Sequence, residues 1–188
     1  MAASEHPHDV HAGVTAASGG TSRGRAKAPP GCALVTGASR GIGAAIARRL
    51  AKGSENGGLP VGITYSRDTE GARRVVAKIE EAGGQAVAIK ADVTDEVEME
   101  SCFAELEERY GRVGVLVNNA GTRVDGLSMD LDDEAWRSVL DTNLSAAYRY
   151  MRRAITPMIR ARSGRIVNIS SVAALRAVPG QVNYSASK

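Results

Sequence analysis

The sequence is poor in aromatic residues, has only two cysteines, and contains no long apolar run. Aromatic residues make up 4% of its 188 residues, so it offers no stacking platform for single-stranded nucleic acid. No uninterrupted apolar segment approaches the roughly 18 residues that a membrane-spanning helix needs. The net charge of +3 comes from interspersed basic and acidic residues, which argues against a phosphate-backbone footprint. We therefore expect neither a nucleic-acid nor a membrane partner.

The two cysteines, Cys32 and Cys102, lie far apart and lack the spacing of metal ligands. We interpret them as free buried thiols in a reducing compartment, which predicts a cytoplasmic location and no metal site. The hydrophobic fraction of 43% and the charged fraction of 24% are ordinary for a globular protein. The length fits a single domain.

Residues 1–30 differ in composition from the rest, being rich in Ala, Gly, Ser and Pro without apolar periodicity. Such a segment cannot bury enough apolar surface to offset its ordering entropy, so we predict a disordered tail. A metal site is the alternative to a mobile polar tail, because the segment holds all three histidines, His6, His8 and His11. Basic residues between positions 23 and 27 hint at an organelle transit peptide, whereas two acidic residues near the start argue against one. An organelle matrix is therefore the alternative location.

From residue 31 onward, short apolar runs alternate with segments of helical periodicity. The predicted strands cover 32–36, 61–65, 86–90, 113–117 and 165–170. Helices are predicted to begin near Gly41, to cover 69–81, to follow Thr94, and to begin near Asp132. The alternation indicates right-handed βαβ units, and hence a Rossmann-type three-layer α/β/α fold with a parallel sheet. Such sheets bind ligands outside the carboxyl ends of their strands, so functional residues should cluster there.

Apolar residues recur at helical spacing within the predicted helices. In the first helix they are Ile42, Ile46 and Leu50. Thr94 is expected to cap the third helix, whose buried stripe would be Met99, Phe103, Leu106 and Tyr110. Pro157 is expected to kink or end the long helix that carries Trp136, Val139, Leu140, Leu144 and Ala147.

A glycine-rich turn follows the first predicted strand, with the sequence Thr36-Gly37-Ala38-Ser39-Arg40-Gly41-Ile42-Gly43. Glycines allow a tight turn and a close approach of backbone to a pyrophosphate. The next helix would aim its N–H groups and positive dipole end at that anion. The alternative is a glycine-rich turn without a ligand. The position between strand and helix favours the phosphate interpretation.

The second strand is followed by Ser66 and Arg67 rather than by the acidic residue that usually accepts from the ribose of NAD. Arg40 and Arg67 could both face a 2′-phosphate, which a planar guanidinium binds bidentately. The alternatives are two solvated arginines, or an NAD site that uses the nearby Asp68. The pattern favours NADP(H).

Ser171, Tyr184 and Lys188 have the residue types needed to reduce a carbonyl group. Residues four apart share a helix face, so Tyr184 and Lys188 should point the same way. A free tyrosine has a pKa of about 10 and is a poor acid near neutral pH, but a nearby ammonium lowers such a pKa. Lys188 could supply that charge, and Ser171 could hydrogen-bond the carbonyl oxygen as charge develops there.

The TGxxxGxG spacing of the turn, together with this serine, tyrosine and lysine, resembles the short-chain dehydrogenase/reductase family. The resemblance implies that Asp92, followed by Val93, hydrogen-bonds the adenine, although alone Asp92 would pass as a turn residue or cap. The segment Asn118-Asn119-Ala120-Gly121 is similar to the family's NNAG segment, which lines the adenosine side or braces the sheet. The resemblance assigns Asn143 a water that relays protons to the lysine; the alternative is a helix-bending Asn satisfied by backbone.

The segments 118–126, 139–144 and 164–188 look like the 3-oxoacyl-acyl-carrier-protein reductase branch of that family. This resemblance implies NADPH-dependent reduction of a small-molecule or carrier-bound β-ketoacyl substrate. It also implies a homotetramer, if a longer chain exists. Family members continue for roughly another third of their length, so residues 31–188 are expected to form an incomplete NADP-binding Rossmann domain with the catalytic residues. The last strands and the lid would be missing. The alternatives are a non-catalytic dinucleotide-binding or interaction module and an unstable fragment.

Overall fold

The computed structural model of the protein describes residues 31–53, 57–176 and 178–188. The tail over residues 1–30, for which disorder is predicted, lies outside the described residues. Within the described part, no helix is both long and apolar enough to cross a membrane.

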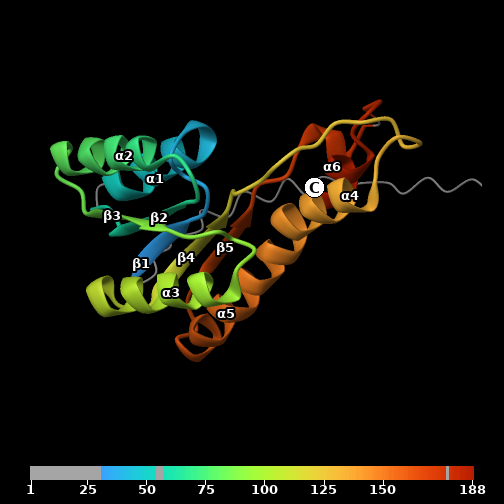
Figure 1. Ribbon diagram of the computed structural model, residues 1–188. Coiled ribbons are helices and arrows are strands. Elements are labelled where there is room, and N and C mark those ends of the chain that lie inside the picture. Colours follow the sequence, from blue (N-terminus) through green and yellow to red (C-terminus); the bar gives the residue numbers. More distant parts are fainter. Residues whose placement is uncertain (1–30, 54–56, 177) are drawn as a thin grey trace, which may run out of the picture.

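Five parallel strands form one sheet, in the order β3-β2-β1-β4-β5. The strands are β1 (Cys32–Val35), β2 (Val61–Tyr65), β3 (Ala86–Lys90), β4 (Val113–Asn118) and β5 (Arg165–Asn168). The helices are α1 (Gly41–Lys52), α2 (Thr69–Glu81), α3 (Glu96–Tyr110), α4 (Asp133–Leu140), α5 (Ala146–Arg160) and α6 (Val182–Ser187). Helices α1 and α2 cover one face of the sheet, and α3 and α5 cover the other (Figure 1). The predicted Rossmann-type parallel α/β fold is confirmed.

The sheet separates two apolar cores, because successive strand residues point to opposite faces. In β1, Ala33 and Val35 join the core under α1 and α2, whereas Cys32 and Leu34 join the core under α3 and α5. All four are fully buried, so β1 lies at the centre of the domain. Both cysteines are buried free thiols that form no disulfide, as predicted. The carboxyl end of β1 therefore provides a rigid base for the glycine turn.

The packing face of α1 is made of small residues. Its buried residues are Gly43, Ala44, Ala47 and Ala51, whereas Ile42 is 63% exposed and Ile46 and Leu50 are only partly buried. Small side chains let the helix approach the sheet closely, and apolar spacing alone does not distinguish this face from the one with larger side chains.

The predicted cap of α3 was wrong. The N-cap is Asp95, whose side chain accepts hydrogen bonds from the N–H groups of Val97 and Glu98. Thr94 instead donates its own N–H and hydroxyl to Asp92. Carboxylates also cap α2 and α4, through Asp68 and Asp132. An acceptor next to a positive helix end explains the preference for Asp at these positions.

The long helix predicted from Asp132 consists of α4, a π-helical segment η1 (Asp141–Ser145) and α5. Pro157 lies inside α5, which continues to Arg160, so the helix does not end at the proline. The break in α-helical geometry comes earlier, at η1. A π-helical turn holds one extra residue and changes the direction of the side chains that follow.

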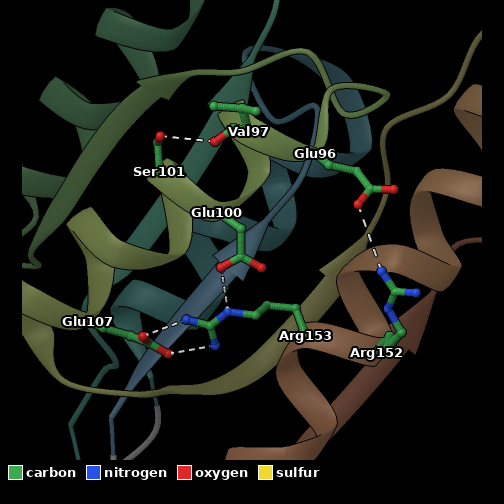
Figure 2. Close-up of polar contacts among 7 residues, drawn as sticks. All are labelled: Glu96, Val97, Glu100, Ser101, Glu107, Arg152 and Arg153. Carbon is green, nitrogen blue, oxygen red and sulfur yellow. Dashed lines mark hydrogen bonds and ion pairs between the residues drawn. The ribbon is translucent and has the colours of Figure 1, made fainter.

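Helix α5 is tied to α3 by charged contacts (Figure 2). The Arg153 guanidinium donates to Glu100 at 2.8 Å and to both carboxylate oxygens of Glu107 at 3.2 and 2.8 Å. It also lies 4.7 Å from the ring centroid of Phe103, a cation–π contact. Arg152 makes a looser contact with Glu96, at 3.8 Å. Arg153 thus holds α5 against α3, on the face of the sheet that these two helices cover.

Candidate active site

The glycine turn lies between β1 and α1, at the carboxyl edge of the sheet. Gly37 has a φ of +63°, and a Cβ there would lie 2.7 Å from the Cα of Ala120. Only glycine therefore fits between the turn and the end of β4. Among the described residues, no side chain caps the start of α1. Its first N–H groups are left to bind an anion, which is the arrangement expected for a pyrophosphate site.

The segment after β4 braces the turn through a small hydrogen-bond network. The Thr36 hydroxyl accepts the N–H groups of Asn119 and Ala120, each at 3.0 Å. The Asn119 amide donates back to the carbonyls of Thr36 and Gly37 at 2.9 and 3.0 Å. Asn118 donates to the Asn168 side chain at 2.8 Å and so links β4 to β5. The segment 118–121 therefore braces the glycine turn and the sheet, as one of its two predicted roles requires.

Arg40 and Arg67 are both exposed, and neither forms an ion pair with another described residue. The competing acid, Asp68, caps α2 by accepting the N–H of Gly71 at 2.8 Å. Its carboxylate is thus already engaged at a helix terminus. The two arginines keep their guanidinium groups available to solvent at the edge of the turn.

Asp92 lies at the end of β3, where its carboxylate accepts the Thr94 N–H at 2.9 Å and the Thr94 hydroxyl at 2.7 Å. These two bonds hold the pKa of Asp92 below its usual range, and the charge of Arg67 acts in the same direction. The same oxygen accepts both bonds, and the backbone N–H of Asp92 donates to Glu98. Asp92 is therefore a turn residue in this structure, and its predicted contact with adenine stays a prediction.

The predicted catalytic residues come from η1, the segment after β5, and α6. Ser171 begins a short 3₁₀ turn, η2 (Val172–Ala174), which packs against α6. The Lys188 N–H donates to the Tyr184 carbonyl at 3.1 Å, so the two residues keep helical i, i+4 spacing. The Lys188 ammonium lies 6.0 Å from the Tyr184 ring centroid. The structure thus brings the tyrosine and the lysine together on one side of α6.

Lys188 and Asn143 meet at Gly121. A Cβ on Gly121 would lie 3.2 Å from the Lys188 ammonium and 3.2 Å from the Asn143 side-chain oxygen. The ammonium donates to the Ile169 carbonyl at 3.1 Å, and burial lowers the pKa of Lys188. A partly buried ammonium with one protein acceptor is well placed to act on a neighbouring polar group.

Asn143 lies in the π-helical segment, where it is 7% exposed. Its side chain accepts the Thr122 N–H at 2.7 Å and donates to the Thr122 carbonyl at 2.9 Å. Its second amide hydrogen goes to the Ser187 hydroxyl at 2.8 Å. The Asn143 side chain is therefore satisfied by the backbone of Thr122 and the hydroxyl of Ser187, and its proton relay to the lysine stays a prediction.

Two residues that position this site were missed in the sequence. Asn183 is fully buried, donates to the carbonyls of Val124 and Ala135 at 2.9 and 3.4 Å, and accepts the Tyr184 N–H at 2.7 Å. Ser187 connects Asn143 to the Tyr184 carbonyl, to which it donates at 2.8 Å. The one available signal was the polar character of residues on both sides of the tyrosine, which is uninformative without knowledge of what they pack against.

The chain is similar in sequence to known reductases. It is 42% identical over 156 residues to the 3-oxoacyl-[acyl-carrier-protein] reductase FabG of Staphylococcus aureus, and 41% identical over 156 residues to the 3-oxoacyl-[acyl-carrier-protein] reductase of a Synechocystis species. Each match covers 83% of this chain and 62% of the relative. The chain thus spans less than two thirds of the length of these curated relatives.

Two solved structures are similar to this chain in both fold and sequence. A variant of actinorhodin polyketide ketoreductase with NADPH matches with a TM-score of 0.78 and 41% identity, over 84% of this chain and 59% of that one. A putative gluconate dehydrogenase from Agrobacterium tumefaciens matches with a TM-score of 0.75 and 36% identity, over 83% of this chain and 60% of that one. A family model for short chain dehydrogenases matches residues 31–188. The glycine turn, the NNAG segment and the tyrosine–lysine pair are thus explained together: this chain belongs to the short chain dehydrogenase family.

Proposed function

We propose that the protein binds NADP(H) and reduces a carbonyl group, with a 3-oxoacyl thioester converted to its 3-hydroxyacyl form. The observation that carries the proposal is the cluster at Gly121, where Asn143 and Lys188 lie together and Lys188 approaches the Tyr184 ring. The choice of a thioester is supported by the reductases that this chain resembles, which are named for 3-oxoacyl carrier-protein substrates. The ketoreductase with NADPH supports the choice of cofactor.

The turn after β1 fits a dinucleotide. Among the described residues, no side chain caps the start of α1, so its first backbone N–H groups are free to bind an anion. The close approach of Gly37 to Ala120 places this turn beside the end of β4. The pyrophosphate would be contacted by four residues at this turn, Ser39, Gly41, Ile42 and Gly43. Arg40 and Arg67 would hold the 2′-phosphate. The adenosine and nicotinamide sides of the cofactor would be lined by Asp92, Val93, Asn118, Ala120, Gly121, Tyr184 and Lys188.

The bound cofactor would supply a hydride to the carbonyl carbon. The remaining chemistry belongs to the protein. Tyr184 donates its phenolic proton to the carbonyl oxygen, and Ser171 hydrogen-bonds that oxygen as it gains negative charge. Lys188 stabilises the resulting phenolate by its charge. Asn143 holds Thr122, in the segment after β4, and Ser187, at the end of α6, in place beside the lysine.

The test is to measure NADPH binding and NADPH oxidation separately. The unsubstituted chain is expected to bind NADPH more tightly than NADH and to oxidise NADPH when a 3-oxoacyl thioester is added. Tyr184→Phe should retain binding and lose at least about 10²-fold in kcat, the low end for a proton donor. The matched control is Tyr148→Phe, since Tyr148 lies on α5 and is 58% exposed.

Two outcomes would contradict the proposal. Binding of NADPH without turnover on any 3-oxoacyl thioester would leave a non-catalytic binding module. Equal kcat for Tyr184→Phe and Tyr148→Phe would remove the tyrosine from the chemistry. The homotetramer and the cytoplasmic location expected from the resemblance and the composition stay predictions, which sedimentation and localisation of the protein can check.

A further inference from the structure

Two buried polar atoms on the α5 side of the sheet have no hydrogen-bond partner among the described residues. They are the Tyr150 hydroxyl and the side-chain oxygen of Asn118. Tyr150 is 1% exposed and Asn118 is 7% exposed, so bulk water cannot satisfy either atom. Native proteins rarely leave such atoms unpaired, and each pairing that is missing needs an explanation.

Both residues line the same small cavity, between α5 and the carboxyl end of β4. The other lining residues are Thr36, Val93, Ala120, Thr142, Ala146 and Ala147. The cavity has a volume of about 10 Å³, which is room for about one water molecule. A nucleotide or a metabolite is far too large for it.

The surroundings of Tyr150 fit a neutral hydroxyl that both donates and accepts. Its ring packs 5.7 Å from that of Phe103, measured between centroids, which fixes the side chain in the apolar core under α3 and α5. Burial raises the pKa of Tyr150, and the negative charges of Asp92 and Glu98 act in the same direction. The raised pKa favours the neutral, protonated hydroxyl.

The Asn118 side chain is oriented by its other branch. Its amide nitrogen donates to Asn168 on β5 at 2.8 Å and lies 3.5 Å from the Ala147 carbonyl on α5. The donor side of the amide is thus occupied, and the oxygen needs a donor from elsewhere. The Tyr150 hydroxyl and this oxygen do not bond to each other in this structure. A water molecule that accepts from the hydroxyl and donates to the oxygen would satisfy both atoms.

We propose that one structural water occupies this cavity, hydrogen-bonded to the Tyr150 hydroxyl and to the Asn118 side-chain oxygen. The water would join α5 to the end of β4, directly behind the segment that braces the glycine turn. The inference concerns folding and does not depend on the proposed reductase function.

The experiment combines a crystal structure of the unsubstituted chain with thermal unfolding of Tyr150→Phe. A density peak within hydrogen-bond distance of both atoms is expected. If the water is present, Phe removes one of its partners, and Tm should fall by roughly 2–6 °C. If the cavity is dry, Phe removes an unsatisfied hydroxyl, and Tm should stay the same or rise. Tyr148→Phe on the same helix is the matched control, because that ring is exposed and its loss of a hydroxyl should leave Tm unchanged.

The inference is overturned by a cavity without density, by a direct bond between the hydroxyl and Asn118, or by a Tm of Tyr150→Phe at or above that of the unsubstituted protein. If Tyr150→Phe does not fold, the crystal structure of the unsubstituted chain decides the question alone.

Discussion

The side-chain amide of Asn143 donates a hydrogen bond to the Ser187 hydroxyl over 2.8 Å, and Ser187 donates in turn to the Tyr184 carbonyl over 2.8 Å. A residue of the π-helical segment is thereby linked to the backbone of the tyrosine proposed as proton donor. The link is buried, since Asn143 and Ser187 are 7% and 5% exposed. The position of α6 relative to the sheet therefore depends on a polar contact rather than on apolar packing alone.

Ser187→Ala is expected to lower the free energy of unfolding by about 1–2 kcal/mol, because one buried amide hydrogen of Asn143 loses its acceptor. It should also lower kcat of the proposed reduction about ten-fold with little change in KM, since a displaced tyrosine affects the chemical step. Urea unfolding and steady-state kinetics measure the two effects. Ser187→Thr keeps the hydroxyl and should recover most of the activity.

The control for that substitution is Ser101→Ala on α3, whose hydroxyl donates to the Val97 carbonyl at an exposed position (Figure 2). Its effect should stay within about 0.5 kcal/mol. If both alanine variants were equally stable, the contact between Asn143 and Ser187 would contribute nothing to the fold.

Arg153→Met is expected to lower the free energy of unfolding by about 1–2 kcal/mol, because it removes a bidentate bond to Glu107 and a bond to Glu100. The difference should shrink at high salt, which screens these partly exposed charges. Arg152→Met is the control: its side chain is 59% exposed and its guanidinium lies 3.8 Å from Glu96, so the loss should be below about 0.5 kcal/mol. Equal losses for the two variants would contradict the prediction.

Gly37→Ala is expected to destabilise the protein by about 2–5 kcal/mol, combining an unfavourable positive φ with a clash against Ala120. Gly41→Ala isolates the first contribution, because Gly41 has a φ of +59° and its Cβ would meet no described atom within 4 Å. The loss at Gly41 should be only about 1–2 kcal/mol. Denaturant unfolding of both variants checks the difference, and similar losses would show that the approach of the turn to β4 is not tight.

The free energy of unfolding is expected to fall between about pH 9 and about pH 12. Burial raises the pKa of Cys32 to about 11 and that of Cys102 to about 12, from an ordinary 9.0. Because the folded state holds these protons longer than the unfolded chain, their contribution is fully present below pH 9 and is lost as pH rises through the folded values. Urea unfolding at several alkaline pH values, with Cys102→Ala as comparison, measures the slope. An identical slope for Cys102→Ala would exclude that thiol as a source.

The strands could be predicted from the sequence because they consist of short apolar runs, although only β1 and β4 are buried throughout and the edge strand β5 is largely exposed. The predictions at β2 and β3 match the observed bounds, and those at β1, β4 and β5 differ by one or two residues at the carboxyl end. Helix α2 is also correct at both ends. The glycine turn and the tyrosine–lysine pair could be located because their spacing is fixed locally.

Features that depend on contacts between distant segments could not be predicted. The alanine and glycine face of α1 is recognised only once the sheet is in place beneath it. The burial of Asn183 and Ser187 depends on the loop after β4 and on η1, which lie 44 to 59 residues away in sequence. Nothing in the segment Asp141–Ser145 signals a π-helical turn, because its hydrogen-bond register is set by what the two flanking helices pack against.

That turn also constrains how the gene can vary. Because a π-helical turn holds one extra residue, deleting one residue within 141–145 would restore regular α-helix and leave α5 in its present orientation relative to α4. Val139 on α4 and Tyr150, Ala154 and Met158 on α5 would then stay in the core. Each further inserted residue would advance the helix by about 100° and turn those α5 side chains out of the core, so this short segment should tolerate a deletion better than an insertion. Substitutions at its exposed positions, such as Leu144, should be accepted.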